Sequence, residues 1–198
     1  EMRVILPSIE RPKKLPVVLG HNEVRQLLKA PKLLKHRLVL AMLYGCGLRS
    51  FELCNLQLKD LDLERMMLHI RQGKGRKDRY VPLCAMQVRG LRKYISAERP
   101  VTWCFNGNDR EGNPVALSTT GVRWIVREAR KHSGIQKEVT THSLRHSYAT
   151  HLLEMGLDII SVKDLLGHAD IQTTLAYLHV AQLGRQRPFS PLERLYNL

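Results

Sequence analysis

The chain has 198 residues, enough for one large domain or for one domain with an appendage at about 150 residues per domain. Hydrophobic residues at 43% and charged residues at 25% are typical of a globular protein, which excludes disorder, and no apolar run approaches the ~18 residues of a membrane span. Its 32 Lys and Arg residues against 18 Asp and Glu residues give a net charge of +14, which favours a polyanionic partner, either nucleic acid or an anionic membrane surface.

The N-terminal part is predicted to be a linker followed by helices. Prolines and a basic pair in residues 7–16, PSIERPKKLP, indicate an extended linker that arrives from something upstream. A short helix is predicted within HNEVRQLLKA, which begins at His21, with Asn22 as its cap. Residues 33–46 are almost wholly apolar after Arg37 and predict a buried helix, and 49–58 predict another short helix.

The middle of the chain predicts a small β element. Residues 66–70 and 80–83 are strand candidates joined by a polar, glycine-bearing turn at 72–78, which is the pattern of a hairpin. A helix is expected over 84–98. Residues 103–105 predict a short third strand, and the polar segment after it is expected to be a loop.

The C-terminal part predicts helices again. They are expected from Ser118 to Gly134, over 142–155, over 158–167 and over about 171–179, and glycines end the first three. Leucines spaced by three in the tail suit a short helix that docks onto something. The predicted fold class is mainly α with a small antiparallel β-sheet (α+β).

Basic residues at two places could meet an anion. Arg49 follows an apolar segment, where an arginine is costly unless it is paired, and Glu52 lies three residues later. A local Arg–Glu pair would explain both equally well. The hairpin turn carries Lys74, Arg76 and Lys77, with Arg79 beside them. Such a tip can reach a phosphate backbone, although a solvated basic turn is the plainer interpretation.

The C-terminal part of the sequence holds Arg145, several histidines and a tyrosine. His142 and Arg145 share a helix face, and His142 and His146 have the spacing of a zinc pair. However, no Glu lies between the histidines as in a metalloprotease, and no third ligand is evident, so capping and core packing explain them better. His168 follows a glycine and precedes Tyr177 by nine residues.

Together, two arginines, a lysine, two histidines and a tyrosine suit phosphoryl transfer with a protein nucleophile. Guanidinium groups can hold the non-bridging oxygens of a phosphodiester, and a tyrosine hydroxyl can attack the phosphorus. A lysine or histidine can protonate the leaving oxygen. No carboxylate cluster for two metal ions stands out, so metal-assisted nuclease chemistry is disfavoured.

Four segments resemble the tyrosine recombinase (phage integrase) family. They are YGCGLRSFELCNL (44–56), GKGRKDRYVPL (73–83), HSLRHSYATHLLEMG (142–156) and LLGHADIQTTLAYLHV (165–180), and they follow the family's order and approximate spacing. The resemblance implies the fold of that family's catalytic domain over residues 20–182. It also implies that residues 1–19 are the linker from an N-terminal core-binding domain that is missing here. The tail, 183–198, is then a hypothetical segment for exchange between protomers.

The resemblance also implies a role for each matched residue. Arg49 and Arg145 resemble the two catalytic arginines, and Tyr177 resembles the nucleophile. Lys74 resembles the mobile lysine that acts as general acid, and His142 and His168 resemble the two pocket histidine positions. Glu52 resembles the acidic residue that supports the pocket. Tyr148 and Tyr196 compete for the nucleophile's role, but only Tyr177 has the LGH-x8-Tyr context.

The function implied by the resemblance is site-specific DNA strand exchange. Attack by Tyr177 would form a 3′-phosphotyrosyl bond that a 5′-hydroxyl later reverses, so neither a metal nor another cofactor is required. The implied partners are double-stranded DNA and further protomers in a tetramer on paired sites, in the bacterial cytoplasm at the nucleoid. A type IB topoisomerase-like enzyme and a non-catalytic DNA-binding module are the alternatives.

Overall fold

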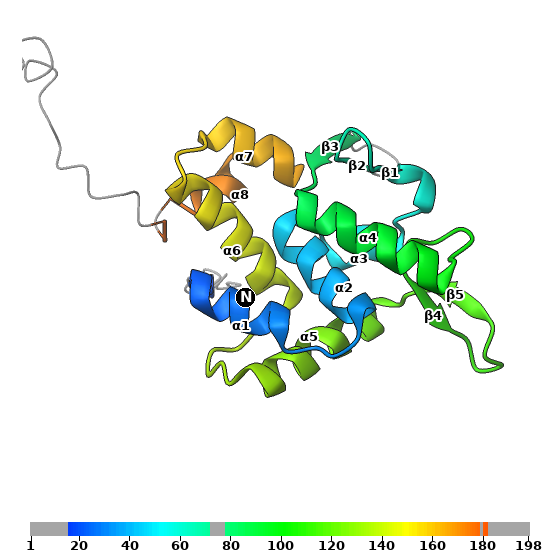
Figure 1. The fold of residues 1–198 in the computed structure, drawn as a ribbon. Coiled ribbons are helices and arrows are strands. Elements are labelled where there is room, and N and C mark those ends of the chain that lie inside the picture. Colours follow the sequence, from blue (N-terminus) through cyan, green and yellow to red (C-terminus); the bar gives the residue numbers. More distant parts are fainter. Residues whose placement is uncertain (1–15, 72–77, 179, 182–198) are drawn as a thin grey trace, which may run out of the picture.

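The computed structural model describes residues 16–71, 78–178 and 180–181 and has the predicted class, mainly helical with small antiparallel sheets (Figure 1). The helices are α1 (His21–Lys29), α2 (Leu34–Gly45), α3 (Ser50–Cys54), α4 (Ala85–Glu98), α5 (Thr119–Ser133), α6 (Thr141–Glu154), α7 (Ile159–Leu166) and α8 (Gln172–Leu175). The strands are β1 (Leu61–Asp62), β2 (Met67–Ile70), β3 (Arg79–Pro82), β4 (Asn106–Asn108) and β5 (Pro114–Ala116). Within the described ranges, no helix has the length and apolarity needed to cross a membrane.

Helix α2 is the centre of the main core, as its apolar sequence predicts. It packs against α1, α4, α5 and α6, and its residues Leu38 to Leu40, Met42 and Leu43 are buried. Each fully buried leucine contributes roughly 1.5–3 kcal/mol relative to an exposed one. This core therefore fixes the position of the segment that follows α2, which carries Arg49.

The predicted hairpin is confirmed, with one additional strand. β2 pairs antiparallel with β3, with Leu68 opposite Val81, and β1 pairs antiparallel with β2 on the other side. β3 lies beside α7, so the sheet edge that carries Arg79 meets the C-terminal helices. The hairpin turn predicted at 72–78 lies almost wholly outside the described residues.

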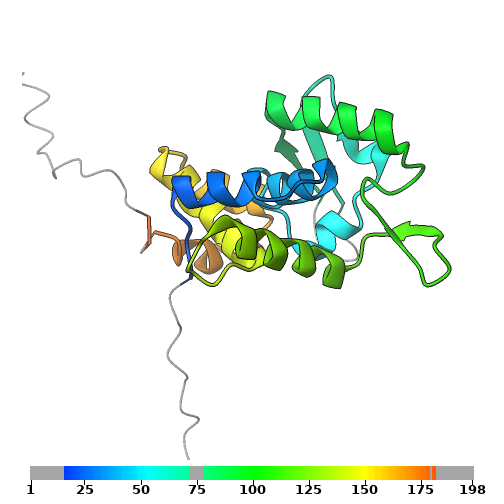
Figure 2. The same cartoon turned by 60° about the horizontal axis from the view of Figure 1, so that its bottom comes forward.

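The prediction for the segment after α4 was wrong in two respects. Residues 103–105 form no strand; Trp103 makes a single bridge with Gln57. The polar segment expected to be a loop instead forms the β4–β5 hairpin, which projects from the body of the molecule (Figure 2). The turn is held locally, because Asp109 Oδ1 accepts hydrogen bonds from the N–H groups of Glu111 and Asn113.

Two predicted helices are shorter than expected. α3 ends at Cys54 because the following backbone pairs elsewhere: the Cys104 N–H donates to Leu56 O at 2.8 Å and the Leu58 N–H donates to Thr102 O at 3.1 Å. α8 spans only four residues and is followed by turns up to Leu178. Tyr177 therefore lies just beyond the end of a short helix.

The C-terminal helices enclose a second, smaller core. Helix α6 is buried on most of its surface, polar residues included, and packs against α2, α5 and α7. The smaller core contains Tyr148, Leu153, Val162, Leu166 and Tyr177, whereas α2 and the sheet belong to the larger one. Helix α6 thus joins the two cores, and Arg145 lies on it.

At the N-terminal end of the described residues, Leu19 is fully buried and anchors the chain to the domain. Its N–H donates to Ser147 Oγ on α6 at 2.9 Å. Residues 1–15 lie outside the described residues, as does the tail 183–198, so the linker and tail assignments stay predictions.

Candidate active site

A cavity of about 950 Å³ lies between the N-terminus of α3, the α6 helix and the α7–α8 region. Its lining brings together five of the six predicted catalytic residues, namely Arg49, His142, Arg145, His168 and Tyr177. Arg79, His146 and Lys163 also line it. These residues are up to 128 positions apart in the chain, from Arg49 to Tyr177, so only the fold assembles them.

Gly47 sets the path of the chain into α3. Its φ of +57° is unfavourable for other residues, and an added Cβ would lie 2.4 Å from the ring of Tyr148. This tight turn places Arg49 at the N-cap of α3, where its backbone N–H donates to Glu52 Oε2 at 2.8 Å. The sequence GLRSFE thus folds so that Arg49 and Glu52 meet.

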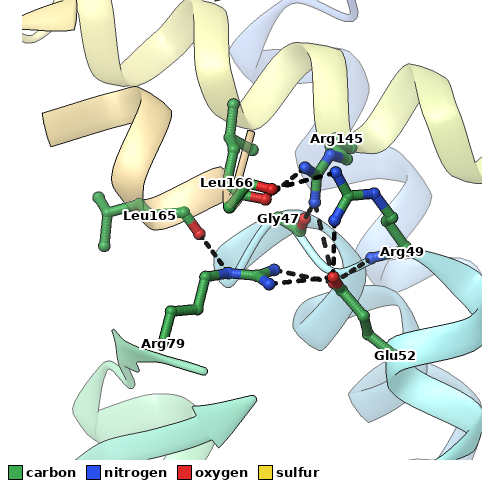
Figure 3. Close-up of polar contacts among 8 residues, drawn as sticks. Gly47, Arg49, Glu52, Arg79, Arg145, Leu165 and Leu166 are labelled. Atoms are coloured by element: carbon green, nitrogen blue, oxygen red, sulfur yellow. Dashed lines mark hydrogen bonds and ion pairs between the residues drawn. The ribbon is translucent and has the colours of Figure 1, made fainter. Parts of the chain in front are cut away.

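Glu52 gathers three arginines at the cavity wall (Figure 3). Arg49 Nη1 donates to Oε1 at 2.8 Å, and Arg79 donates from Nη1 to Oε1 at 3.0 Å and from Nη2 to Oε2 at 2.8 Å. Arg145 Nη1 lies 3.8 Å from Oε2. Burial opposes ionisation of this carboxyl, but the hydrogen bonds and charge of Arg79 outweigh it and hold the pKa of Glu52 below its usual value.

Arg145 is buried and fixed by backbone carbonyls. Its Nη1 donates to Gly47 O and its Nη2 donates to Leu166 O, both at 2.6 Å. Burial lowers the pKa of Arg145 to about 10, with Arg49 adding to the effect, so the group stays protonated at neutral pH. Two of the five guanidinium N–H groups are used in this way, which leaves donors for an anion in the cavity.

Arg79 is buried, although its basic neighbours in the turn suggested an exposed position. The sequence groups it with DNA-contacting residues, but its side chain is only 7% exposed. Besides Glu52 it binds Leu165 O, to which Nε donates at 2.8 Å. Its main contacts are therefore inside the protein, where it joins β3 to α3 and to the end of α7.

His168 stands at the end of α7 in a neutral form. Its Nδ1 is 2.9 Å from Thr174 Oγ1. Burial, with the charges of Arg145 and Arg49 adding to it, lowers the pKa of His168 to about 4. At neutral pH the ring is therefore uncharged and can offer a hydrogen bond rather than a positive charge to a group in the cavity.

Tyr177 reaches the cavity from the turn after α8 and is 4% exposed. Its hydroxyl lies 3.0 Å from His146 Nδ1, and its ring stacks on that of His168 with centroids 6.3 Å apart. Burial raises the pKa of Tyr177, while the charges of Arg145 and Arg49 act in the opposite direction. Both predicted arginines therefore act electrostatically on the predicted nucleophile.

The two competing tyrosines and the remaining predicted basic residues lie outside the cavity lining or outside the described residues. Tyr148 is buried against Gly47 and does not line the cavity. Tyr196 lies outside the described residues, as do the predicted general acid Lys74 and the predicted DNA-contacting Arg76 and Lys77.

The histidine pair that suggested zinc is used otherwise. The rings of His142 and His146 are 6.4 Å apart, and His146 Nδ1 is engaged by Tyr177. A separate group of His21, His151 and Glu154 has ligand atoms within 4.8 Å of one another. However, the two imidazole rings there are stacked, and Tyr44 Oη lies 2.8 Å from His151 Nδ1, so the group is explained by packing.

Sequence reasoning missed two side-chain contacts at this site, that of His146 with Tyr177 and that of Arg79 with Glu52. It gave His146 only a zinc or packing interpretation, although its position four residues after His142 places it on the same helix face. It also did not foresee that Arg79 binds Glu52. Nothing local signals that pair, because 27 residues and the hairpin separate the two positions.

The chain is similar to known recombinases and integrases. The model of the phage integrase family matches residues 17–183. The chain is 40% identical over 191 residues to the putative integrase/recombinase y4qK of Sinorhizobium fredii. The matched region covers 96% of this chain and 61% of that protein. It is also 40% identical over 171 residues to the tyrosine recombinase XerA of Thermococcus onnurineus, and this match covers 85% of this chain and 60% of that protein. The chain thus spans about three fifths of the length of these relatives.

Solved structures share the fold. The crystal structure of XerA recombinase has a TM-score of 0.76 at 32% identity and covers 94% of this chain and 66% of that one. The post-cleavage complex of XerH site-specific recombinase with a palindromic difH substrate has a TM-score of 0.73 at 26% identity and covers 93% of this chain and 54% of that one. On the family match, this fold and these relatives, the chain belongs to the phage integrase family.

Proposed function

We propose that the chain is the catalytic part of a site-specific DNA recombinase, which cuts and rejoins strands through a 3′-phosphotyrosyl bond in integration, excision or resolution. The observation that carries this proposal is the convergence of Arg49, Arg145, His168 and Tyr177 on one cavity. Basic charge alone would fit a DNA-binding module, but a tyrosine hydroxyl that shares one cavity with two guanidiniums suits attack on a phosphodiester.

The phosphate would be held by groups that are already in place. Arg49 and Arg145 line the cavity, each with more N–H donors than its contacts inside the protein use, and neutral His168 adds a hydrogen bond. Charge that develops on the non-bridging oxygens would meet donors fixed by Glu52 and by the carbonyls of Gly47 and Leu166. Such preorganised donors stabilise a transition state more than mobile ones.

The bond changes follow from these positions. Tyr177 Oη attacks phosphorus, a tyrosyl–phosphate bond forms and the bond to the 5′ oxygen breaks. By resemblance, Lys74 protonates that oxygen, and His142 assists proton movement from the exposed turn of α6. A 5′-hydroxyl from another strand then reverses the step, so the bond energy stays in the covalent link.

The partners belong to the same proposal. The net charge of +14 supports binding to a DNA backbone, and the XerH structures contain difH DNA. Assembly into a tetramer on paired sites, with the tail exchanged between protomers, and association with a bacterial nucleoid complete the proposal. The relatives named as recombinases favour strand exchange over the topoisomerase-like alternative.

A trapping experiment tests the proposal. The chain is incubated with a pool of nicked duplexes of randomised central sequence, in which cleavage releases a short oligonucleotide and prevents religation. We expect an SDS-stable protein–DNA adduct, attached at Tyr177 by peptide mapping, from which the preferred sequence is read. The absence of any adduct, or attachment at Tyr148 or Tyr196, would contradict the proposal.

A second assay separates the enzymatic alternatives. Once a sequence is recovered, plasmids with one copy and with two copies of it are incubated with the chain. Exchange of segments between two copies is expected of a recombinase. Relaxation of supercoils on plasmids without any selected site would indicate a topoisomerase-like enzyme.

A further inference from the structure

His146 is the described residue that holds the hydroxyl of Tyr177. The hydroxyl lies 3.0 Å from Nδ1, and the ring centroids are 5.4 Å apart. His146 follows Arg145 directly on α6, so one helical turn carries both a guanidinium for phosphate and an imidazole at the nucleophile. His146 is half-buried and lines the cavity.

Burial and neighbouring charges favour the neutral form of the His146 imidazole. His142 and Arg145 face it from α6, Tyr177 faces it from the turn after α8, and His168 and Arg49 lie beyond that tyrosine in the same cavity. Burial first, and then the charges of His142 and Arg145, lower the pKa of His146 below its usual value. A neutral imidazole that receives the tyrosine O–H at Nδ1 carries its own proton at Nε2.

From this geometry we infer that His146 is the proton acceptor that activates Tyr177 for attack. The inference rests on the proposed function. A phenol is a weak nucleophile until its proton is removed, and a base must lie within about 2.6–3.2 Å of that proton's oxygen, which His146 does.

The step balances as a single transfer. The proton of Tyr177 Oη moves to His146 Nδ1 as the Oη–phosphorus bond forms, and the bond from phosphorus to the 5′ oxygen breaks. That oxygen takes its proton from the general acid. In the reverse step, the imidazolium of His146 returns its proton to Tyr177 as the tyrosine leaves.

The other histidines of the cavity suit this role less well. The Nδ1 of His168 is engaged by Thr174, and a pKa of about 4 makes its imidazole a weak base. His142 is exposed, and its ring lies a further turn away on α6, 6.4 Å from that of His146. The hydroxyl hydrogen bond of Tyr177 goes to His146.

The test compares His146→Gln and His146→Ala with the unchanged chain, using a nicked duplex selected from the randomised pool. Gln keeps a side-chain acceptor but cannot take a proton, and Ala leaves room for added imidazole. We expect the rate of adduct formation to fall by ~10²-fold in both variants, the contribution typical of general base catalysis, and imidazole to restore part of it in His146→Ala. DNA binding and the melting temperature should change little.

A leaving-group substrate separates the base from the acid. In a duplex with a 5′-bridging sulfur at the cleaved bond, the leaving thiolate needs no proton. We expect this duplex to restore cleavage in Lys74→Ala but not in His146→Gln. Restoration in His146→Gln would place His146 on the leaving-group side and overturn the inference.

The matched control is His132→Gln, an exposed histidine in the last turn of α5. It should cleave like the unchanged chain. If His146→Gln also kept the unchanged rate and pH profile, the histidine would only position the tyrosine and the inference would be wrong. Failure of the unchanged chain to form any adduct would instead count against the proposed function.

Discussion

The two sides of the cavity are held in different ways. On the arginine side, Glu52 binds three guanidiniums, and Arg79 and Arg145 also donate to backbone carbonyls, so each charge is fixed by several contacts. On the tyrosine side, Tyr177 follows a four-residue helix, belongs to the smaller core and has one hydroxyl hydrogen bond, to His146. The groups that would bind phosphate are thus fixed by several charged hydrogen bonds, whereas the nucleophile is held by packing in the smaller core and, among the described residues, by one hydroxyl hydrogen bond.

This difference fits the demands of the two tasks. Charges that stabilise a transition state act best when they need no reorganisation. A nucleophile that must reach phosphorus and later leave it needs a segment that can shift at low cost, and the segment here is a four-residue helix and a turn that pack on the smaller of the two cores.

The largest effect is expected at the tyrosine side. Tyr177→Phe removes the nucleophilic oxygen, so adduct formation with the nicked duplex should fall to background. The ring stays buried, and the lost hydrogen bond to His146 costs only about 0.5–1.5 kcal/mol in the free energy of unfolding. Denaturing gels and a denaturant melt measure the two effects, and DNA binding should persist. An adduct in this variant would show that Tyr177 is not the nucleophile.

The next effect should appear at the arginine side, in stability rather than in chemistry alone. Glu52→Gln leaves buried guanidiniums without their counter-charge, and breaking such a buried pair costs about 3–5 kcal/mol. Denaturant unfolding measures it. The control is Glu128→Gln on α5, whose pair with Lys131 lies at the surface and should contribute far less to stability. Equal losses in both variants would contradict the contrast between the two sides.

The same carboxyl predicts a pH dependence. Because the pKa of Glu52 is lowered in the folded state, its contribution is present above the ordinary value of 4.5 and is lost as the pH falls through the folded value. The free energy of unfolding should therefore decrease on acidification below about pH 4.5. Thermal melts should show a weaker decrease in Glu52→Gln, and identical pH profiles would be evidence against the arginine cluster.

A smaller effect tests the role of Arg79. Arg79→Lys loses the paired contact with Glu52, which we expect to cost about 1–3 kcal/mol of stability. The salt dependence of DNA binding is measured in Arg79→Met, which removes the charge, and its slope should stay unchanged. Neutralising Arg76 or Lys77, if each contacts phosphate, should instead make the slope of log K against log salt less negative by about 0.9. Binding titrations at several salt concentrations measure this. A less negative slope in Arg79→Met would show that Arg79 contacts DNA directly.

The smallest effect concerns the support of His168. Thr174→Val keeps the shape of a fully buried residue but removes the hydroxyl that contacts His168 Nδ1. A lost neutral hydrogen bond of about 1 kcal/mol corresponds to a roughly fivefold slower cleavage. Single-turnover cleavage rates measure it. An unchanged rate would show that the cavity itself orients the ring of His168.

The sequence determined the local elements and the chemistry of the site. Helix ends were predictable because capping depends on near neighbours: Ser118 caps α5, and Gly167, with a φ of 62°, ends α7. The motifs around Arg49, Arg145 and Tyr177 predicted by resemblance which groups react, and the structure places these three residues at one cavity. The β4–β5 hairpin was missed because a polar segment without alternating apolar residues carries little strand signal.

Only the tertiary structure decided which side chains pair. Arg79 binds Glu52 rather than lying exposed at a basic turn, and His146 binds Tyr177 rather than a metal. Both partners come from distant elements, and a buried charge or hydroxyl must find an acceptor wherever the fold brings one near. Local sequence shows which groups can react, but the packing of α3, β3, α6 and the turn after α8 decides which groups hold them.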